Sequence, residues 1–201
     1  MQAIAQFAAD ERYRPMLPEV GALPGLQALL SSHLPHVQQC ALSAIANTSF
    51  VPAAAAPLCA TGVLAHLGQL LFSAEEATQT MCLTALSNLL GASPQSSDAL
   101  VQVGGHMALL TLLSSPSAEK QSQAAMSVGH MCRHAPALQA MMAADAVPLL
   151  ANLLHSPSPA VQLQAVYALA NPSPSHNPDP NPNPNPNPDP NPNPNQVARA
   201  R

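Results

Sequence analysis

Apolar and polar residues recur along this chain with a fixed period. The stretch from Gly21 to Asn47 returns at 62–88, 104–130 and 145–171, at successive offsets of 41, 42 and 41 residues. A period of this length is typical of solenoid proteins, in which each unit buries its apolar face against its neighbours. The chain is therefore expected to be a stack of similar units rather than one globular core.

Within each unit, the apolar positions follow a helical pattern. A Leu-Leu pair and a Ser are followed by a Gln, and then by small or apolar residues at positions i, i+3 and i+4. This spacing places the later residues on one stripe of a helix. In chain order, the stripes are Ala41, Ala44 and Ile45; Cys82, Ala85 and Leu86; Ala124, Ser127 and Val128; and Ala165, Ala168 and Leu169.

Each unit is predicted to contain three helices. In the first complete unit we expect them at 11–19, 23–32 and 36–49, because Gly21 interrupts the first helix and Pro24 and Pro35 suit first helical turns. Residues 3–6 repeat the pattern of 44–47, so we expect the chain to begin inside a unit. The predicted division is 1–9 as the last helix of a truncated unit, complete units at 10–50, 51–91, 92–134 and 135–171, and a tail at 172–201.

The tail differs in composition from the rest of the chain. Eleven of the 23 prolines lie between Pro172 and Pro194, mostly alternating with Asn. Alternate prolines prevent helix and sheet formation and favour polyproline II, so we expect a disordered, low-complexity segment. A spacer or a ligand for a proline-binding domain is one interpretation, and an expanded repeat without a function is the one that the uniform composition favours.

Composition favours an all-α fold and limits the partners. Aromatic residues make up 2% of the chain and Trp is absent, which suits helix packing better than a β-sandwich. Residues 1–171 hold eight Asp or Glu against four Lys or Arg, without a basic stripe, so nucleic acid is not an expected partner. With no signal peptide and no membrane-spanning apolar run, we expect no membrane insertion and an intracellular protein, in the cytoplasm or alternatively the nucleus or cilium.

Candidate chemistry is sparse. The four cysteines lack metal-site or disulfide spacing, so they are expected to be reduced packing residues. His130 and His134, four residues apart, could share a helix face and hold a metal, but no third ligand is evident, and the other histidines are expected to face solvent. No nucleophile, acid–base pair or phosphate loop is evident, so we predict a protein that is not an enzyme and has no cofactor or metal.

The motif Gly-Ala-Leu-Pro-x-Leu-x-x-Leu-Leu-Ser-Ser, followed by Val-Gln-x-x-Ala-Leu-x-Ala-Ile-x-Asn, resembles the armadillo repeat. Arg14, seven residues before Gly21, matches a basic residue that is usual in the first helix of that family. The resemblance covers about residues 1–171. It implies a right-handed α-solenoid with three helices per repeat and about four repeats.

The resemblance also implies a binding site. In the family the third helices line a concave groove, where an Asn at the end of the motif bonds the backbone of an extended peptide; an amide can do so because it both donates and accepts. An alternative is that each Asn only caps its helix or bonds the next loop. By position, the groove residues are Asn47, Asn88, Asn171 and His130, which replaces Asn, and, one helical turn earlier, Ser43, Thr84, Met126 and Tyr167.

The earlier-turn position separates branches of the family. Importin-α-like adaptors typically have Trp there, and this chain never does, so a cargo adaptor of that kind is disfavoured; the Lys and Arg rows of a β-catenin-like groove are also missing. The chain is more similar to general scaffolds such as the vacuolar adaptor and axonemal armadillo proteins. We therefore predict a non-catalytic scaffold, monomeric or part of a larger assembly, that binds a protein or peptide in the groove. The alternative is a structural array that binds laterally, or a nonfunctional fragment with adhesive ends.

Overall fold

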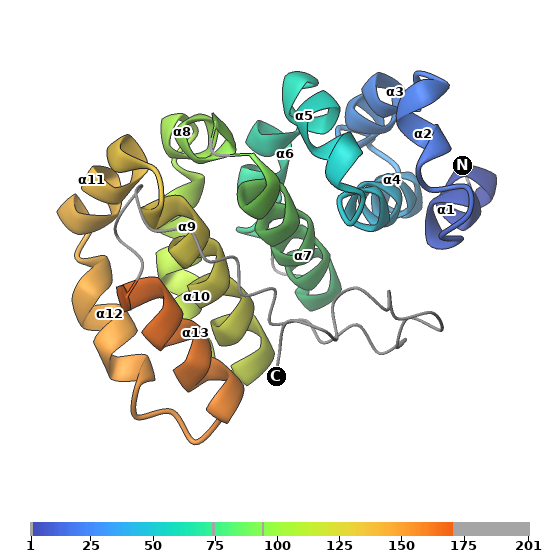
Figure 1. The fold of residues 1–201 in the computed structure, drawn as a ribbon. Coiled ribbons are helices and arrows are strands. Elements are labelled where there is room, and N and C mark those ends of the chain that lie inside the picture. Colours follow the sequence, from blue (N-terminus) through green and yellow to red (C-terminus); the bar gives the residue numbers. More distant parts are fainter. Residues whose placement is uncertain (1, 74, 94, 171–201) are drawn as a thin grey trace, which may run out of the picture.

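The computed structural model describes residues 2–73, 75–93 and 95–170, and within them the chain forms thirteen α-helices and no strand (Figure 1). The predicted all-α solenoid is therefore confirmed. Asn171 and the predicted Asn-Pro tail lie outside the described residues.

The helices fall into one leading helix and four groups of three. The leading helix is α1 (Gln2–Ala9). In order, the groups are α2 (Met16–Glu19), α3 (Ala22–Leu29) and α4 (Pro35–Thr48); α5 (Pro52–Ala60), α6 (Val63–Leu70) and α7 (Glu76–Ala92); α8 (Gln95–Gln102), α9 (Gly105–Leu113) and α10 (Ala118–Cys132); and α11 (Ala135–Ala143), α12 (Ala146–Leu153) and α13 (Pro159–Ala170). Three helices per repeat and about four repeats are confirmed.

The turn between the first and second helix of each group has the same backbone conformation. Gly21, Gly62 and Gly104 have φ values of 69°, 81° and 72°, in the left-handed region, and Asp145 takes φ 54° at the equivalent place. Glycine enters this region without a Cβ clash, and Asp is one of the few other residues that tolerate it. The period of the sequence therefore has a direct backbone cause.

The predicted first helix at 11–19 is mostly wrong, because only α2 is helical there. Pro15 and Pro18 lack the N–H that a helix interior needs, and the Asp10 carboxylate accepts the backbone N–H of Arg12 at 3.0 Å. That bond offers the backbone an alternative to the helix. The predicted third helix is confirmed, with Pro35 at the start of α4, and Pro159 plays the same part in α13.

Consecutive third helices pack side by side. Helix α4 contacts α1 and α7, and α10 contacts α7 and α13, so α1, α4, α7, α10 and α13 form one continuous row. Figure 1 shows α5, α8 and α11 on the side of the molecule away from that row. Fully buried leucines such as Leu42, Leu83 and Leu86 fill the space between the layers, and Cys82 is fully buried where three other repeats have Ala.

None of the described helices is by itself long and apolar enough to cross a membrane. Helices α5 and α6 reach the required length and composition only together, and they meet at an angle of 91°.

Candidate functional site

The predicted groove residues lie on the row of third helices. We call the seven that the structure describes the third-helix face. All seven are half-buried, so each exposes part of its side chain while the rest packs on the solenoid. They are Ser43 and Asn47 on α4, Thr84 and Asn88 on α7, Met126 and His130 on α10, and Tyr167 on α13.

The two described asparagines keep hydrogen-bonding groups for a partner. The Asn88 amide donates one N–H to the Ser49 hydroxyl at 3.0 Å, and that hydroxyl donates to the Ala46 carbonyl at 2.7 Å. The second N–H and the carbonyl oxygen of Asn88 take no hydrogen bond within the described residues, and neither does the side chain of Asn47. The bond to Ser49 therefore fixes the orientation of the Asn88 amide and leaves half of its capacity for a partner.

A polar network joins α7 to α10 beneath Thr84. The Thr84 hydroxyl lies 3.0 Å from the Thr80 carbonyl and 3.3 Å from Oε1 of Gln123. Below it, the hydroxyls of Ser87 and Ser127 lie 2.6 Å apart, with Ser127 also 2.9 Å from the Gln123 carbonyl. The sequence carries one trace of this network, since Ser127 stands where the other repeats have Ala.

An aromatic pair replaces the amide at the α10–α13 end of the face. The His130 and Tyr167 rings are 6.1 Å apart and meet edge to face at 74°. A Cβ on Gly91 would lie 3.2 Å from Nε2 of His130, so the imidazole rests on the α7 backbone. This half of the face is bulky and weakly polar, whereas the half on α4 and α7 presents amides and small hydroxyls.

The idea that His130 and His134 share a helix face is wrong. Helix α10 ends at Cys132, and His134 precedes α11, where its Nδ1 lies 3.0 Å from the Asp98 carboxylate on α8. Among the described residues, no three His, Cys, Asp or Glu side chains are placed to hold a metal together. The expectation that the other histidines face solvent is wrong for His66, which is half-buried and bonds Gln27 at 3.2 Å and Ser31 at 2.8 Å.

All four Lys and Arg side chains of the described residues are bonded within the chain. Arg12 pairs with Asp10 at 2.7 Å, and Arg14 donates to the carbonyls of Ala8 at 2.9 Å and Ala9 at 3.2 Å. The buried Lys120 ammonium lies 2.9 Å from Oε1 of Gln79 and 3.2 Å from a Glu76 oxygen, and Arg133 donates to the Gly91 carbonyl at 3.0 Å. These cations link helices and leave no basic row on this surface.

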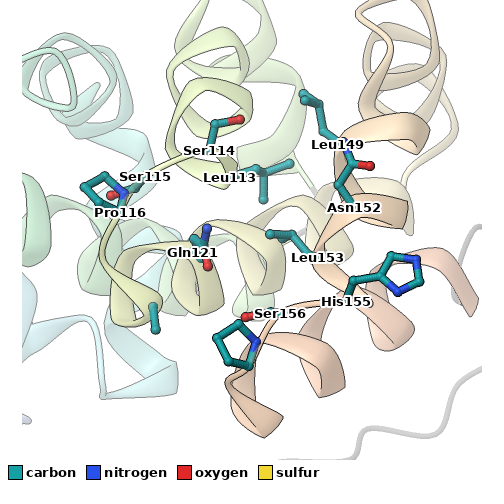
Figure 2. A pocket seen from close by; sticks show the side chains of 12 residues that line it. Leu113, Ser114, Ser115, Pro116, Gln121, Leu149, Asn152, Leu153, His155 and Ser156 are labelled. Atoms are coloured by element: carbon teal, nitrogen blue, oxygen red, sulfur yellow. The ribbon is translucent and has the colours of Figure 1, made fainter.

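Two cavities lie away from the third-helix face. One, of about 390 Å³, is bounded by the loops that precede α10 and α13, and Figure 2 shows Leu113, Gln121 and Leu153 gathered around it. The other, of about 510 Å³, lies between the first two repeats beside Pro24 and Pro57. Neither is lined by a predicted groove residue, so the face and the cavities are separate features.

Gln121 differs from its equivalents in the other repeats. Gln38, Gln79 and Gln162 each donate from Nε2 to a carbonyl at the end of the preceding second helix or its loop, at 2.6, 3.1 and 2.9 Å. No such bond forms at Gln121, whose side chain lines the cavity instead. The repeated Gln therefore joins the second helix to the third in three repeats out of four.

Comparison with known families agrees with this architecture. The Armadillo/beta-catenin-like repeat model matches residues 55–91, and a HEAT-like repeat model matches residues 118–171. The chain is an armadillo/HEAT repeat protein. The armadillo resemblance seen in the sequence is thus confirmed, and the second match falls on α10 to α13, where the face changes character.

Several engineered repeat proteins are similar to this armadillo/HEAT chain in structure. A designed armadillo repeat protein in complex with the peptide (KR)4 is 27% identical with a TM-score of 0.76, over 84% of this chain and 72% of that one. Computationally designed armadillo repeat proteins for modular peptide recognition are 27% identical, TM-score 0.78, over 85% and 73%. A further engineered protein is 29% identical, TM-score 0.77, over 85% and 70%. A search of curated proteins gave no match.

Proposed function

We propose that this chain is a non-catalytic interaction scaffold that binds an extended segment of a partner protein along the third-helix face. The observation that carries the proposal is the placement of Asn47 and Asn88 on adjacent third helices, each half-buried with free hydrogen-bonding groups. A fixed amide can pair with peptide N–H and C=O groups whatever the side chains of the partner. The designed relative that is similar over most of its length holds a peptide.

Helix spacing sets how much partner each repeat reads. Packed helices lie about 8–10 Å apart, and an extended chain rises about 3.3 Å per residue. One repeat therefore spans between two and three residues of an extended segment. The described face, from α4 to α13, accommodates about ten residues at that spacing.

The side chains of the face favour an uncharged segment. The seven residues of the third-helix face include no carboxylate, Lys or Arg. A basic segment such as (KR)4 would lose hydration without gaining an ion pair, which is unfavourable. Small polar side chains suit the part beside Ser43 and Thr84, whereas apolar or aromatic side chains suit the part beside Met126 and Tyr167.

The test compares partner capture by matched variants of the full chain. The Asn47→Ala, Asn88→Ala double variant removes the two amides, and Asn152→Ala removes an exposed amide on α12, at the cavity shown in Figure 2. We expect proteins captured from cell extract by the wild type to be retained by Asn152→Ala and lost at least tenfold by the double variant, with unchanged circular dichroism. Equal capture by all three would overturn the proposal.

A direct probe addresses the chemistry of the segment. Titration of the full chain with the (KR)4 peptide, followed by calorimetry, should give no measurable binding at micromolar concentration. Micromolar binding would refute the uncharged-segment argument while leaving a groove scaffold in place, so the two parts of the proposal are separable.

A further inference from the structure

The last repeat exposes apolar side chains at positions that are buried in the earlier repeats. Val166 on α13 is 52% exposed, although its equivalents Leu42, Leu83 and Ala125 are fully buried. Because α13 already has α11 and α12 of its own repeat, the cover that Val166 lacks is that of a following repeat. Leu154 shows the same difference, since it is 36% exposed while Leu30, Leu71 and Leu113 are at most 2% exposed.

The first described helix shows the complementary difference. Phe7 on α1 is 49% exposed, whereas its equivalents Thr48, Leu89 and Met131 are fully buried. Its ring meets Tyr13 edge to face, with centroids 5.4 Å apart. Tyr13 is 41% exposed at a position that small, buried residues occupy in the other three repeats. The two rings therefore form an apolar surface where the helices of a preceding repeat would lie.

These two end surfaces match each other through the repeat itself. Helix α1 packs on α4 as α4 packs on α7 and α10 on α13, so α1 is a third helix without a predecessor and α13 is one without a successor in the described chain. Figure 1 shows the two helices at opposite ends of the row. We propose that a second copy of this chain covers these surfaces, with α1 of one copy packed on α13 of the other as the next third helix.

Charge does not oppose this contact. Helix α1 has no charged residue, and residues 135–170 contain Asp145 as their one Asp, Glu, Lys or Arg. Burial of Val166, Leu163 and Phe7 from water is the driving force, as in the junctions between repeats within one copy. The contact joins two different surfaces, so it is heterologous and leaves one free end on each side. Association therefore continues beyond a dimer as concentration rises.

The test measures the mass of the full 201-residue chain by analytical ultracentrifugation from about 1 to 200 µM. We expect the weight-average mass to rise with concentration. Val166→Glu and Phe7→Glu should each abolish that rise, because each removes one of the two surfaces. Phe72→Glu is the control, because Phe72 and its equivalents Ser31, Ser114 and His155 are all exposed. It should associate like the wild type.

Mixing distinguishes this arrangement from the alternatives. Val166→Glu and Phe7→Glu each retain the surface that the other lacks, so an equimolar mixture should form a 1:1 dimer that grows no further. A wild type that stays monomeric at 200 µM would overturn the proposal, as would a mixture that stays monomeric. Loss of association in Val166→Glu but not in Phe7→Glu would indicate symmetric pairing of two α13 ends instead. If Val166→Glu unfolds by circular dichroism, Leu163→Glu alters the same exposed face.

Discussion

Gly129 sets the separation of α10 and α13, and replacing it with Ala tests the packing of the third helices. A Cβ at this position would lie 2.9 Å from Cδ1 of Tyr167 and 3.2 Å from the backbone Cα of Ala168. Gly25, in the exposed part of α3, would place its Cβ more than 4 Å from any other group. The same substitution therefore changes helix propensity equally at both sites and packing at only one.

The two effects can be compared in free energy. Ala is favoured over Gly in a helix interior by about 0.8–1 kcal/mol, so Gly25→Ala should stabilise the fold by up to about that amount. Overpacking a close contact costs about 1–3 kcal/mol, and the Ala168 backbone cannot move aside as a side chain would. Gly129→Ala should therefore destabilise by up to about 2 kcal/mol.

Thermal and urea unfolding followed by circular dichroism measure both variants. At about 2–4 °C per kcal/mol for a domain of this size, Gly25→Ala should raise the midpoint and Gly129→Ala should lower it. In a Tyr167→Ala background, which removes the nearest ring atom, the loss caused by Gly129→Ala should shrink. If Gly129→Ala were as stabilising as Gly25→Ala, the close α10–α13 contact would be refuted.

Two other features give measurable outcomes. Gln38→Ala should cost about 1 kcal/mol in urea unfolding, because it removes the bond to the Leu30 carbonyl, whereas Gln121→Ala, which removes no such bond, should stay within about 0.5 kcal/mol; equal losses would contradict the asymmetry. Burial raises the pKa of Cys82 to about 12, so the folded state keeps this thiol protonated above pH 9 while the unfolded chain ionises it. Stability should therefore be unaffected by this thiol below about pH 8 and fall as pH rises from about 9 towards 12, by at most about 1.4 kcal/mol per pH unit, and Cys82→Ala should reduce the slope between pH 8 and 10; an unchanged slope would contradict the assignment.

The repeat in the sequence was sufficient to predict the fold. Matching positions 41 or 42 residues apart reflect one structural unit used four times, and Gly21, Gly62 and Gly104 mark a turn that needs a left-handed residue. Where the repeat pattern was extended without checking local chemistry, it failed. The short α2 results from Pro15 and Pro18, whose missing N–H groups outweigh the pattern that the other repeats share.

The candidate site could be predicted only in outline. Repeat position identified which residues share the third-helix face, because helical spacing is a local property. It could not show that Asn88 is oriented by Ser49 or that His130 packs against Tyr167, since those partners lie about 40 residues apart and depend on how closely two repeats approach. The cavity at Gln121 was missed for the same reason, because the Gln is present in every repeat and only its hydrogen bond is absent.

The distribution of charge explains why the third-helix face is neutral. Lys120, Arg133 and Asp98 all make contacts between neighbouring repeats, to Glu76, to the Gly91 carbonyl and to His134. Partial burial strengthens such contacts, whereas salt screens exposed charges on a groove. With the few charges used in this way, selection of a partner on the face depends on amide–backbone hydrogen bonds at one end and on apolar contact with Met126 and Tyr167 at the other. Both kinds of contact act at short range, so the shape of the partner segment, rather than its charge, determines binding.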